Sequence, residues 1–252
     1  MIDGRAIYMS AQATFDVGFL QWLRKTTEAA WRDYKTRDFV AQKRTGSDWM
    51  AGTKWLADLS DEAVLQIEVQ WNLKFPSQYR LFLCYLHAID HPMIQARFGD
   101  GGIKLERGIA FYNWQVNKLD IKQALSEPIE GVLFDVLVNG LWLRTWGRQP
   151  DAQSEKELIV RERLAHAPKL IPFIENQYIV DATNIHTNIV LSVVQSDIIL
   201  SATNLRQFFV NEFTTLLKLE PSAILDDSPA LKLKELEQIP LWGELAMRNY
   251  IS

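Results

Sequence analysis

Residues 170–209 read LIPFIENQYIVDATNIHTNIVLSVVQSDIILSATNLRQFF, and this stretch decides the fold that we predict. It contains short runs of β-branched and apolar residues, which are typical of strands. These runs are 171–174, 178–180, 189–194 and 198–200. Asn204 then stands where a helix N-cap is expected, ahead of apolar side chains at helical spacing. We therefore predict several strands followed directly by a helix.

Helical patterns lie on both sides of this β-rich stretch. Apolar residues at spacings of three and four predict a helix over residues 15–31. Ser60 suits the N-cap of a second helix, and Pro76 suits the start of a third that should end near Ala88. A last helix is expected over residues 231–237. Helices at both ends around a β-rich centre indicate an α+β fold.

The segments between these helices carry mostly turn signals. Residues 35–52 are polar and read as a loop. Glycines at 99, 101 and 102 indicate turns, and residues 108–114 are expected to form a strand that enters a loop.

Composition excludes several classes of protein. The chain has 252 residues with 27 basic and 31 acidic side chains, which give a net charge of −4, and 48% of its residues are hydrophobic. The single cysteine, Cys84, excludes an internal disulfide and a cysteine-based zinc site. A pI near 5.6 argues against a general nucleic-acid binder. No signal-peptide pattern and no apolar run long enough to span a membrane are present, so we expect a cytoplasmic protein.

Negative charge gathers near the C-terminus. Residues 219–244 carry six acidic side chains against two lysines. Such a segment could steer a basic partner, although an ordinary solvated surface is the commoner explanation.

The residues with catalytic or ligating chemistry do not form a convincing site in the sequence. His87 and His91 are four residues apart, but Pro92 disfavours helical geometry at His91, so we predict no metal and no cofactor. Ser192, His186 and Asp197 could be written as a triad, yet the GxSxG elbow is missing.

Other reactive side chains favour structural roles. Cys84 lies between core-like neighbours and reads as a buried structural thiol. Glu68 and Asp197 read as hydrogen-bond acceptors near the ends of elements, rather than as an acid–base pair. We therefore predict no catalytic residue.

The chain has nine tryptophans, and Trp114, Trp142 and Trp146 lie in its middle. Core packing is the ordinary explanation for such residues. The functional alternative is an exposed anchor for a protein partner, because tryptophan, tyrosine and arginine dominate binding hot spots.

The order of several motifs resembles the SUKH superfamily, which groups fungal cell-wall-assembly regulators with bacterial immunity proteins against polymorphic toxins. The run 167–172, the strands that follow it and Glu212-Phe213 resemble the C-terminal half of that family. Trp142 and Trp146-Gly147-Arg148 resemble its tryptophan–glycine element. Its N-terminal signature is matched by Glu68, Pro76 and Tyr79.

The resemblance covers roughly residues 55–215 and departs from the family at one point. Many relatives carry histidine, arginine and tyrosine where this chain has Asn176, Gln177 and Tyr178. A basic or imidazole-based site is therefore not expected there.

The resemblance implies a single domain over residues 1–252, with helical extensions at 1–54 and 216–252. It implies an α+β fold with a central, mainly antiparallel sheet flanked by helices. It also implies a non-enzymatic immunity protein that binds a toxin domain, possibly a nuclease, in the cytoplasm, without contacting nucleic acid or membrane directly. A regulatory or scaffold module of the same fold, and a hydrolase centred on His186 and Asp197, remain alternatives, and the oligomeric state stays open. The candidate partner-binding residues are Trp114, Trp142, Trp146, Arg148, Tyr178, Asp181, His186 and Asp197.

Overall fold

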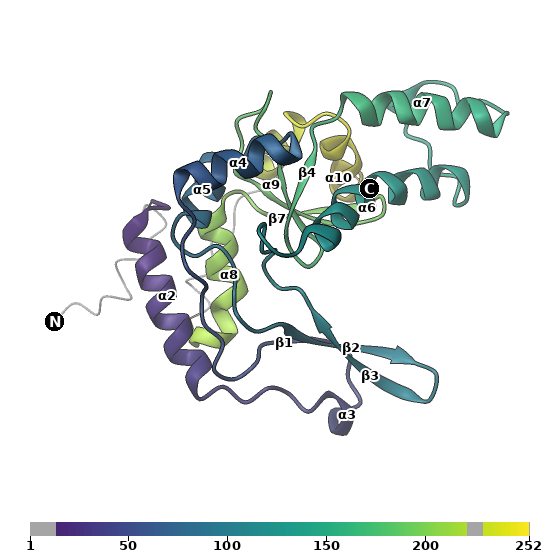
Figure 1. Cartoon of the computed structure of the whole chain (residues 1–252). Coiled ribbons are helices and arrows are strands. Elements are labelled where there is room, and N and C mark those ends of the chain that lie inside the picture. The colour runs from purple at the N-terminus through teal and green to yellow at the C-terminus, as the bar shows by residue number, and fades with distance from the viewer. Residues whose placement is uncertain (1–13, 221–228, 252) are drawn as a thin grey trace.

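The computed structural model describes residues 14–220 and 229–251, and it is built from helices and antiparallel strands (Figure 1). The predicted α+β class is confirmed, but the strands form two sheets instead of one central sheet. The three-stranded sheet has the order β1 (Gly46–Asp48), β2 (Met93–Gly99), β3 (Gly102–Gly108). The four-stranded sheet has the order β4 (Leu170–Ile174), β5 (Gln177–Val180), β6 (Val190–Val194), β7 (Asp197–Ala202). Each neighbouring pair is antiparallel.

The described helices lie before, between and after the two sheets. They are α2 (Val17–Arg32), α3 (Phe39–Gln42), α4 (Asp61–Trp71), α5 (Ser77–Leu83), α6 (Lys118–Leu137), α7 (Gln153–His166), α8 (Leu205–Leu217), α9 (Pro229–Glu237) and α10 (Trp242–Ile251).

Capping residues begin these helices as the sequence predicts. The side chain of Ser60 accepts a hydrogen bond from the backbone N–H of Ala63, and Asn204 accepts one from Gln207. The predicted extension of α5 to Ala88 is wrong. The helix ends at Leu83, and His87 adopts a left-handed backbone with φ of 63° that an α-helix cannot contain.

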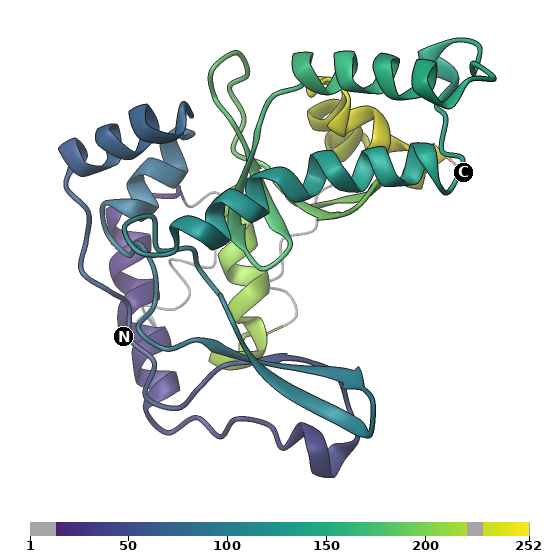
Figure 2. The same cartoon turned by 45° about the vertical axis from the view of Figure 1, so that its right-hand side comes forward.

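The four-stranded sheet separates two hydrophobic cores, and helices lie on both sides of this sheet (Figures 1 and 2). One face packs on an aromatic core with α2, α5 and α8, where Phe82, Phe173 and Phe209 are in contact. The other face packs on α6 and α10, with Val132 and Leu245 fully buried. The predicted C-terminal helical extension is therefore part of a core.

Several elements differ from the sequence-based prediction. Residues 35–52 contain α3 and β1 in addition to loops. The strand expected over 108–114 is wrong, because β3 ends at Gly108 and only an isolated bridge from Phe111 to Ile174 follows. Helices α6, α7 and α10 were not predicted, nor was the hairpin of β2 and β3. None of the helices in the described ranges is long and apolar enough to cross a membrane.

Candidate functional site

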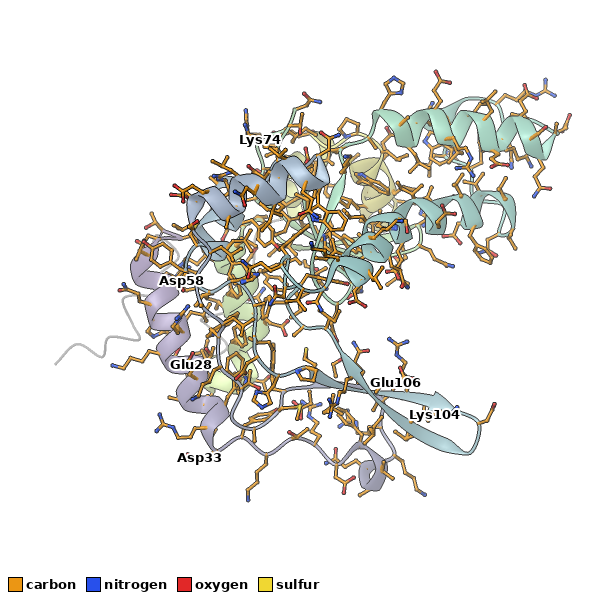
Figure 3. The ribbon with its side chains drawn as sticks, in the orientation of Figure 1. Glu28, Asp33, Asp58, Lys74, Lys104 and Glu106 are labelled. Atoms are coloured by element: carbon orange, nitrogen blue, oxygen red, sulfur yellow. The ribbon has the colours of Figure 1, made fainter. Side chains whose placement is uncertain are left out.

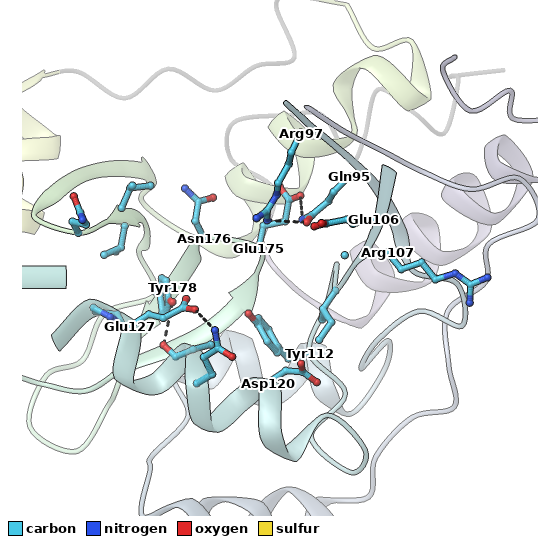
Figure 4. Close-up of a pocket in the computed structure, with 18 residues that line it drawn as sticks. Gln95, Arg97, Glu106, Arg107, Tyr112, Asp120, Glu127, Glu175, Asn176 and Tyr178 are labelled. Atoms are coloured by element: carbon cyan, nitrogen blue, oxygen red, sulfur yellow. Dashed lines mark hydrogen bonds between the residues drawn. The ribbon is translucent and has the colours of Figure 1, made fainter. Parts of the chain in front are cut away.

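The candidate site is an open cleft of about 770 Å³ between the β2–β3 hairpin, helix α6 and the turns of the four-stranded sheet (Figure 4). Charged side chains from four separate elements line it. The carboxylates are Glu106, Asp120, Glu127 and Glu175, and the guanidinium group is that of Arg97, whereas Arg107 borders the cleft with its side chain directed away from it (Figure 4). The excess of carboxylates favours a cationic ligand over an anionic one.

Helix α6 supplies two of these carboxylates because of its periodicity. Asp120, Gln123 and Glu127 are spaced by three and four residues, which places them on one helix face. Gln123 Nε2 donates a hydrogen bond to Glu127 Oε1 at 3.0 Å, which fixes the direction of that carboxylate.

Glu175 ties the two sheets together at the edge of the cleft. It lies in the two-residue turn between β4 and β5, with φ of 47°. Its Oε1 accepts one hydrogen bond from Ser47 Oγ of β1 and another from Gln95 Nε2 of β2 at 3.1 Å. The cleft is therefore a built junction between the sheets, held in part by one of its own carboxylates.

Two buried tyrosines also line the cleft. The pKa of Tyr112 is raised to about 12. Burial is the main cause, and the nearby carboxylates of Glu127 and Asp120 contribute to the same rise. Tyr178 donates a hydrogen bond to the backbone oxygen of Ala124 at 3.1 Å, and burial raises its pKa as well. Both side chains therefore remain neutral phenols, and the negative charge of the cleft comes from the carboxylates.

Two candidate tryptophans, Trp114 and Trp146, are buried, which agrees with core packing and not with the alternative of an exposed anchor. Trp114 is 1% exposed, packs edge-on against Trp71 at 6.0 Å, and donates from Nε1 to the Tyr79 hydroxyl at 2.7 Å. Trp146 is buried against Trp142, with ring centroids 5.4 Å apart, and the guanidinium of Arg163 lies over its ring. Core packing, the ordinary explanation, accounts for both.

The polar candidates Tyr178 and Asp181 are also buried, for a structural reason. Asp181 is 4% exposed, and its carboxylate accepts hydrogen bonds from the backbone N–H groups of Lys74 at 2.7 Å and Thr183 at 2.8 Å. It therefore joins the end of β5 to the loop between α4 and α5. Asp181 is thus buried in a structural contact, and Tyr178 forms part of the wall of the cleft.

The remaining candidates are accessible but do not form one surface. Trp142 is half-buried and Arg148 exposed, and both lie in the connection between α6 and α7. His186 is exposed in the connection between β5 and β6, whereas Asp197 is exposed at the start of β7. The length of β6, roughly 16 Å, separates these last two positions.

The candidate triad is not assembled by this arrangement. Ser192 is in β6, and its Oγ accepts a hydrogen bond from Asn176 Nδ2 at 2.9 Å. His186 and Asp197 lie beyond opposite ends of that strand.

His87, His91 and Cys84 do not come together in one site among the described residues. His87 is buried, whereas His91 pairs with Asp90, 2.7 Å from Nδ1 to Oδ1. Cys84 is partly exposed, so the predicted full burial of this thiol is wrong. Its partial burial and the neighbouring carboxylate of Asp61 raise the pKa of the thiol to about 11. In the described ranges no group of three or more His, Cys, Asp or Glu side chains is placed to hold a metal.

The structural role predicted for Glu68 is confirmed. Its carboxylate accepts hydrogen bonds from the backbone N–H of Phe75 at 2.7 Å and from Arg80 at 2.5 Å. It thus closes the connection between α4 and α5. Of the predicted acidic C-terminal segment, Asp226 and Asp227 lie outside the described residues, and Glu244 accepts a hydrogen bond from Thr145 Oγ1 at 2.9 Å.

The cleft residues were missed by sequence reasoning, although weak signals existed. Glu106 belongs to an alternating polar set on β3, and Asp120 and Glu127 share a helical face. Nothing in the sequence indicates that Glu175 meets Ser47, which is 128 residues away. Comparison with family models, curated proteins and solved structures gave no match, so the resemblance to the SUKH superfamily stays a prediction.

Proposed function

We propose that this chain is a non-enzymatic, cytoplasmic immunity protein that binds a toxin domain and neutralises it. The observation that carries the proposal is the open cleft with its four carboxylates, Glu106, Asp120, Glu127 and Glu175. A toxin domain that acts on nucleic acid needs a basic surface to hold phosphates. A lysine or arginine of such a surface would find opposite charge in this cleft, and the same charge would speed the encounter.

The resemblance described above supports the same proposal. Its N-terminal signature, Glu68 with Pro76 and Tyr79, falls at the junction of α4 and α5, where Glu68 has a structural role. Its C-terminal run falls on an antiparallel sheet followed by α8. Both agree with the fold that the resemblance implies.

The experiment is a protection assay with a candidate toxin domain, chosen from the genes that neighbour the one for this chain. The domain is expressed with and without this chain, and binding of the purified pair is measured by calorimetry. We expect survival only with the chain present, and an affinity that falls with added salt because exposed charges are screened. Absence of both protection and a complex would sink the proposal. Recovery of a housekeeping protein in a pull-down would favour the scaffold alternative instead.

Helix α6 offers a matched pair of variants for the cleft. Glu127 and Glu130 are both exposed on this helix, but only Glu127 lines the cleft. Glu127→Lys should weaken toxin binding at least about tenfold, since opposite charges at an interface become like charges. Glu130→Lys makes the same change of net charge outside the cleft and should leave the affinity close to wild type. Equal effects would show that overall charge, and not the cleft, determines binding.

A further inference from the structure

Strand β3 is an edge strand on a hairpin that projects from the body of the molecule (Figures 1 and 3). It pairs with β2 along its whole length and with no other strand among the described residues. Residues 104–107 are all exposed. An exposed edge of this length presents a row of backbone N–H and C=O groups to which another strand can bind.

The register of the hairpin gives it one polar face and one face that is apolar except for the exposed Arg107, which lies opposite Ile94. On the apolar face Leu105 lies opposite Ala96 and Ile103 opposite Phe98, with Phe98 77% and Leu105 52% exposed. Such exposure of large apolar side chains on one face is typical of a surface that becomes covered.

The charges of the polar face are not balanced within the hairpin. Lys104 lies directly opposite Arg97, and like charges in this position destabilise a sheet. Neither Lys104 nor Glu106 has an ion-pair partner within the part of the chain that the structure describes. Figure 3 labels both side chains on the hairpin.

We propose that β3 pairs antiparallel with β3 of a second copy of this chain, about a twofold axis at Leu105. In this register Lys104 of each copy lies opposite Glu106 of the other, so that two opposite-charge pairs form. Leu105 meets its own counterpart on the apolar face. Ile103 of each copy lies opposite Arg107 of the other, and Gly102 lies opposite Gly108, so no side chains meet at the two ends of the paired segment.

The same charges disfavour the neighbouring symmetric registers. An axis at Lys104 would place the two Lys104 side chains opposite each other, and an axis at Glu106 would do the same for the two Glu106 side chains. If the pairing is shifted by one residue, the polar face of one β3 strand lies on the same side of the joined sheet as the apolar face of the other. The sequence of β3 is thus self-complementary in one central register, and that register also joins the apolar faces of the two hairpins into one strip.

The test is sedimentation of the purified chain over a range of concentrations, with no toxin present. This inference goes beyond the proposed immunity function, and although Glu106 also lines the cleft, a measurement without toxin reports on the dimer alone. The wild-type chain should reach twice its monomer mass of 29.1 kDa as concentration rises. Lys104→Glu and Glu106→Lys should each weaken the dimer about tenfold, because each replaces two attractive pairs by two repulsive ones.

Two controls distinguish charge pairing from damage to the hairpin. The double variant Lys104→Glu with Glu106→Lys restores opposite charges at both pairs and should dimerise like the wild type. An equimolar mixture of the two single variants should form a heterodimer, because one strand is then acidic and the other basic at both positions.

Three results would overturn the proposal. The first is a wild-type chain that stays monomeric at every concentration, which is also the result expected if a strand of a different protein occupies this edge. The second is a dimer that neither single variant weakens. The third is a loss of dimerisation in the single variants that neither the double variant nor the mixture reverses.

Discussion

His87 should contribute a pH-dependent part to the stability of this protein, and replacing His87 should remove that part. The side chain is 2% exposed, and its Nε2 has no hydrogen-bond partner among the described residues. Burial lowers its pKa from the ordinary 6.5 to about 4, and a hydrogen bond with the backbone of Ala57 opposes only part of that effect. The folded protein therefore keeps His87 neutral where the unfolded chain would protonate it.

The size of the effect follows from the two pKa values. Below pH 6.5 the unfolded chain binds a proton that the folded state rejects, so stability is lost as pH falls from 6.5 towards 4. Each unit of difference corresponds to about 1.4 kcal/mol. The contribution of His87 to the free energy of unfolding should therefore drop by about 2 kcal/mol between pH 7.5 and pH 5.

Glu212 of α8 acts in the opposite direction over the same range. Burial, with a smaller contribution from Glu175, raises its pKa from 4.5 to about 7. The folded state thus takes up a proton before the unfolded chain does, and stability is gained as pH falls from 7 towards 4.5. Glu212 is partly exposed, and solvent reduces this effect. The gain in the free energy of unfolding by pH 5 should therefore be at most about 2 kcal/mol. The wild-type protein should consequently show a shallow profile that hides both groups.

Urea denaturation at pH 5, 6 and 7.5 separates the two contributions. Asparagine is the suitable replacement for His87, because it tolerates the left-handed backbone at this position. The stability of His87→Asn relative to wild type should rise by about 2 kcal/mol from pH 7.5 to pH 5. The stability of Glu212→Gln relative to wild type should fall over the same interval. A constant difference between His87→Asn and wild type at all three pH values would refute the buried neutral histidine.

Three substitutions test contacts that hold the elements together. Gly131→Ala would place a Cβ 2.6 Å from the Cα of Gln195, so α6 and the β6–β7 turn must separate; we expect a loss of about 1–3 kcal/mol by urea denaturation, and an unchanged midpoint would contradict this contact. Asp181→Ala leaves two backbone N–H groups without their acceptor and should cost about 2–4 kcal/mol, with Asp181→Asn recovering part of it; an equal loss in both variants would point to charge rather than hydrogen bonding. Tyr79→Phe removes the acceptor of the Trp114 indole and should cost about 1–3 kcal/mol in thermal or urea unfolding, whereas a negligible loss would show that the indole finds another acceptor.

The sequence predicts elements well where local signals and the core agree. Strands β4 to β7 were predicted because short runs of β-branched and apolar residues are separated by turn residues. The start of α8 was predicted because Asn204 caps the helix. Helix α6 was missed because it contains Pro128 and Gly131, which read as helix breakers. Pro128 is nevertheless buried in the helix, and Gly131 is needed for the close approach of Gln195.

Strands and helices with little burial escaped prediction for a related reason. Strand β3 is exposed on both faces except at half-buried Ile103 and buried Gly108, so its composition resembles that of a polar loop. Helix α7 buries only Val160 and Leu164, which is too little apolar surface to give a clear helical period. Packing of distant elements, and not a local pattern, stabilises such segments.

The candidate site depended on tertiary structure even more strongly. Trp114 is buried because Trp71 and Phe75, about forty residues earlier, pack against it. Trp142 and Trp146 do contact each other, but through a short 3-10 turn rather than along one face of an α-helix. Residue type alone therefore could not tell a core tryptophan from a binding anchor.

The charges of the cleft give a reason why it should be occupied by a partner. The carboxylates of Glu127 and Asp120 already raise the pKa of the buried Tyr112, so their field extends into the core beneath them. Carboxylates gathered in one cleft repel each other, and this repulsion opposes folding unless cations balance it. Arg97 supplies one such cation at the hairpin, but it is directed to Gln95, its hydrogen-bond acceptor at 3.1 Å. A basic group of a partner would relieve the remaining repulsion, so the features that cost stability in the free protein are those that would favour the complex.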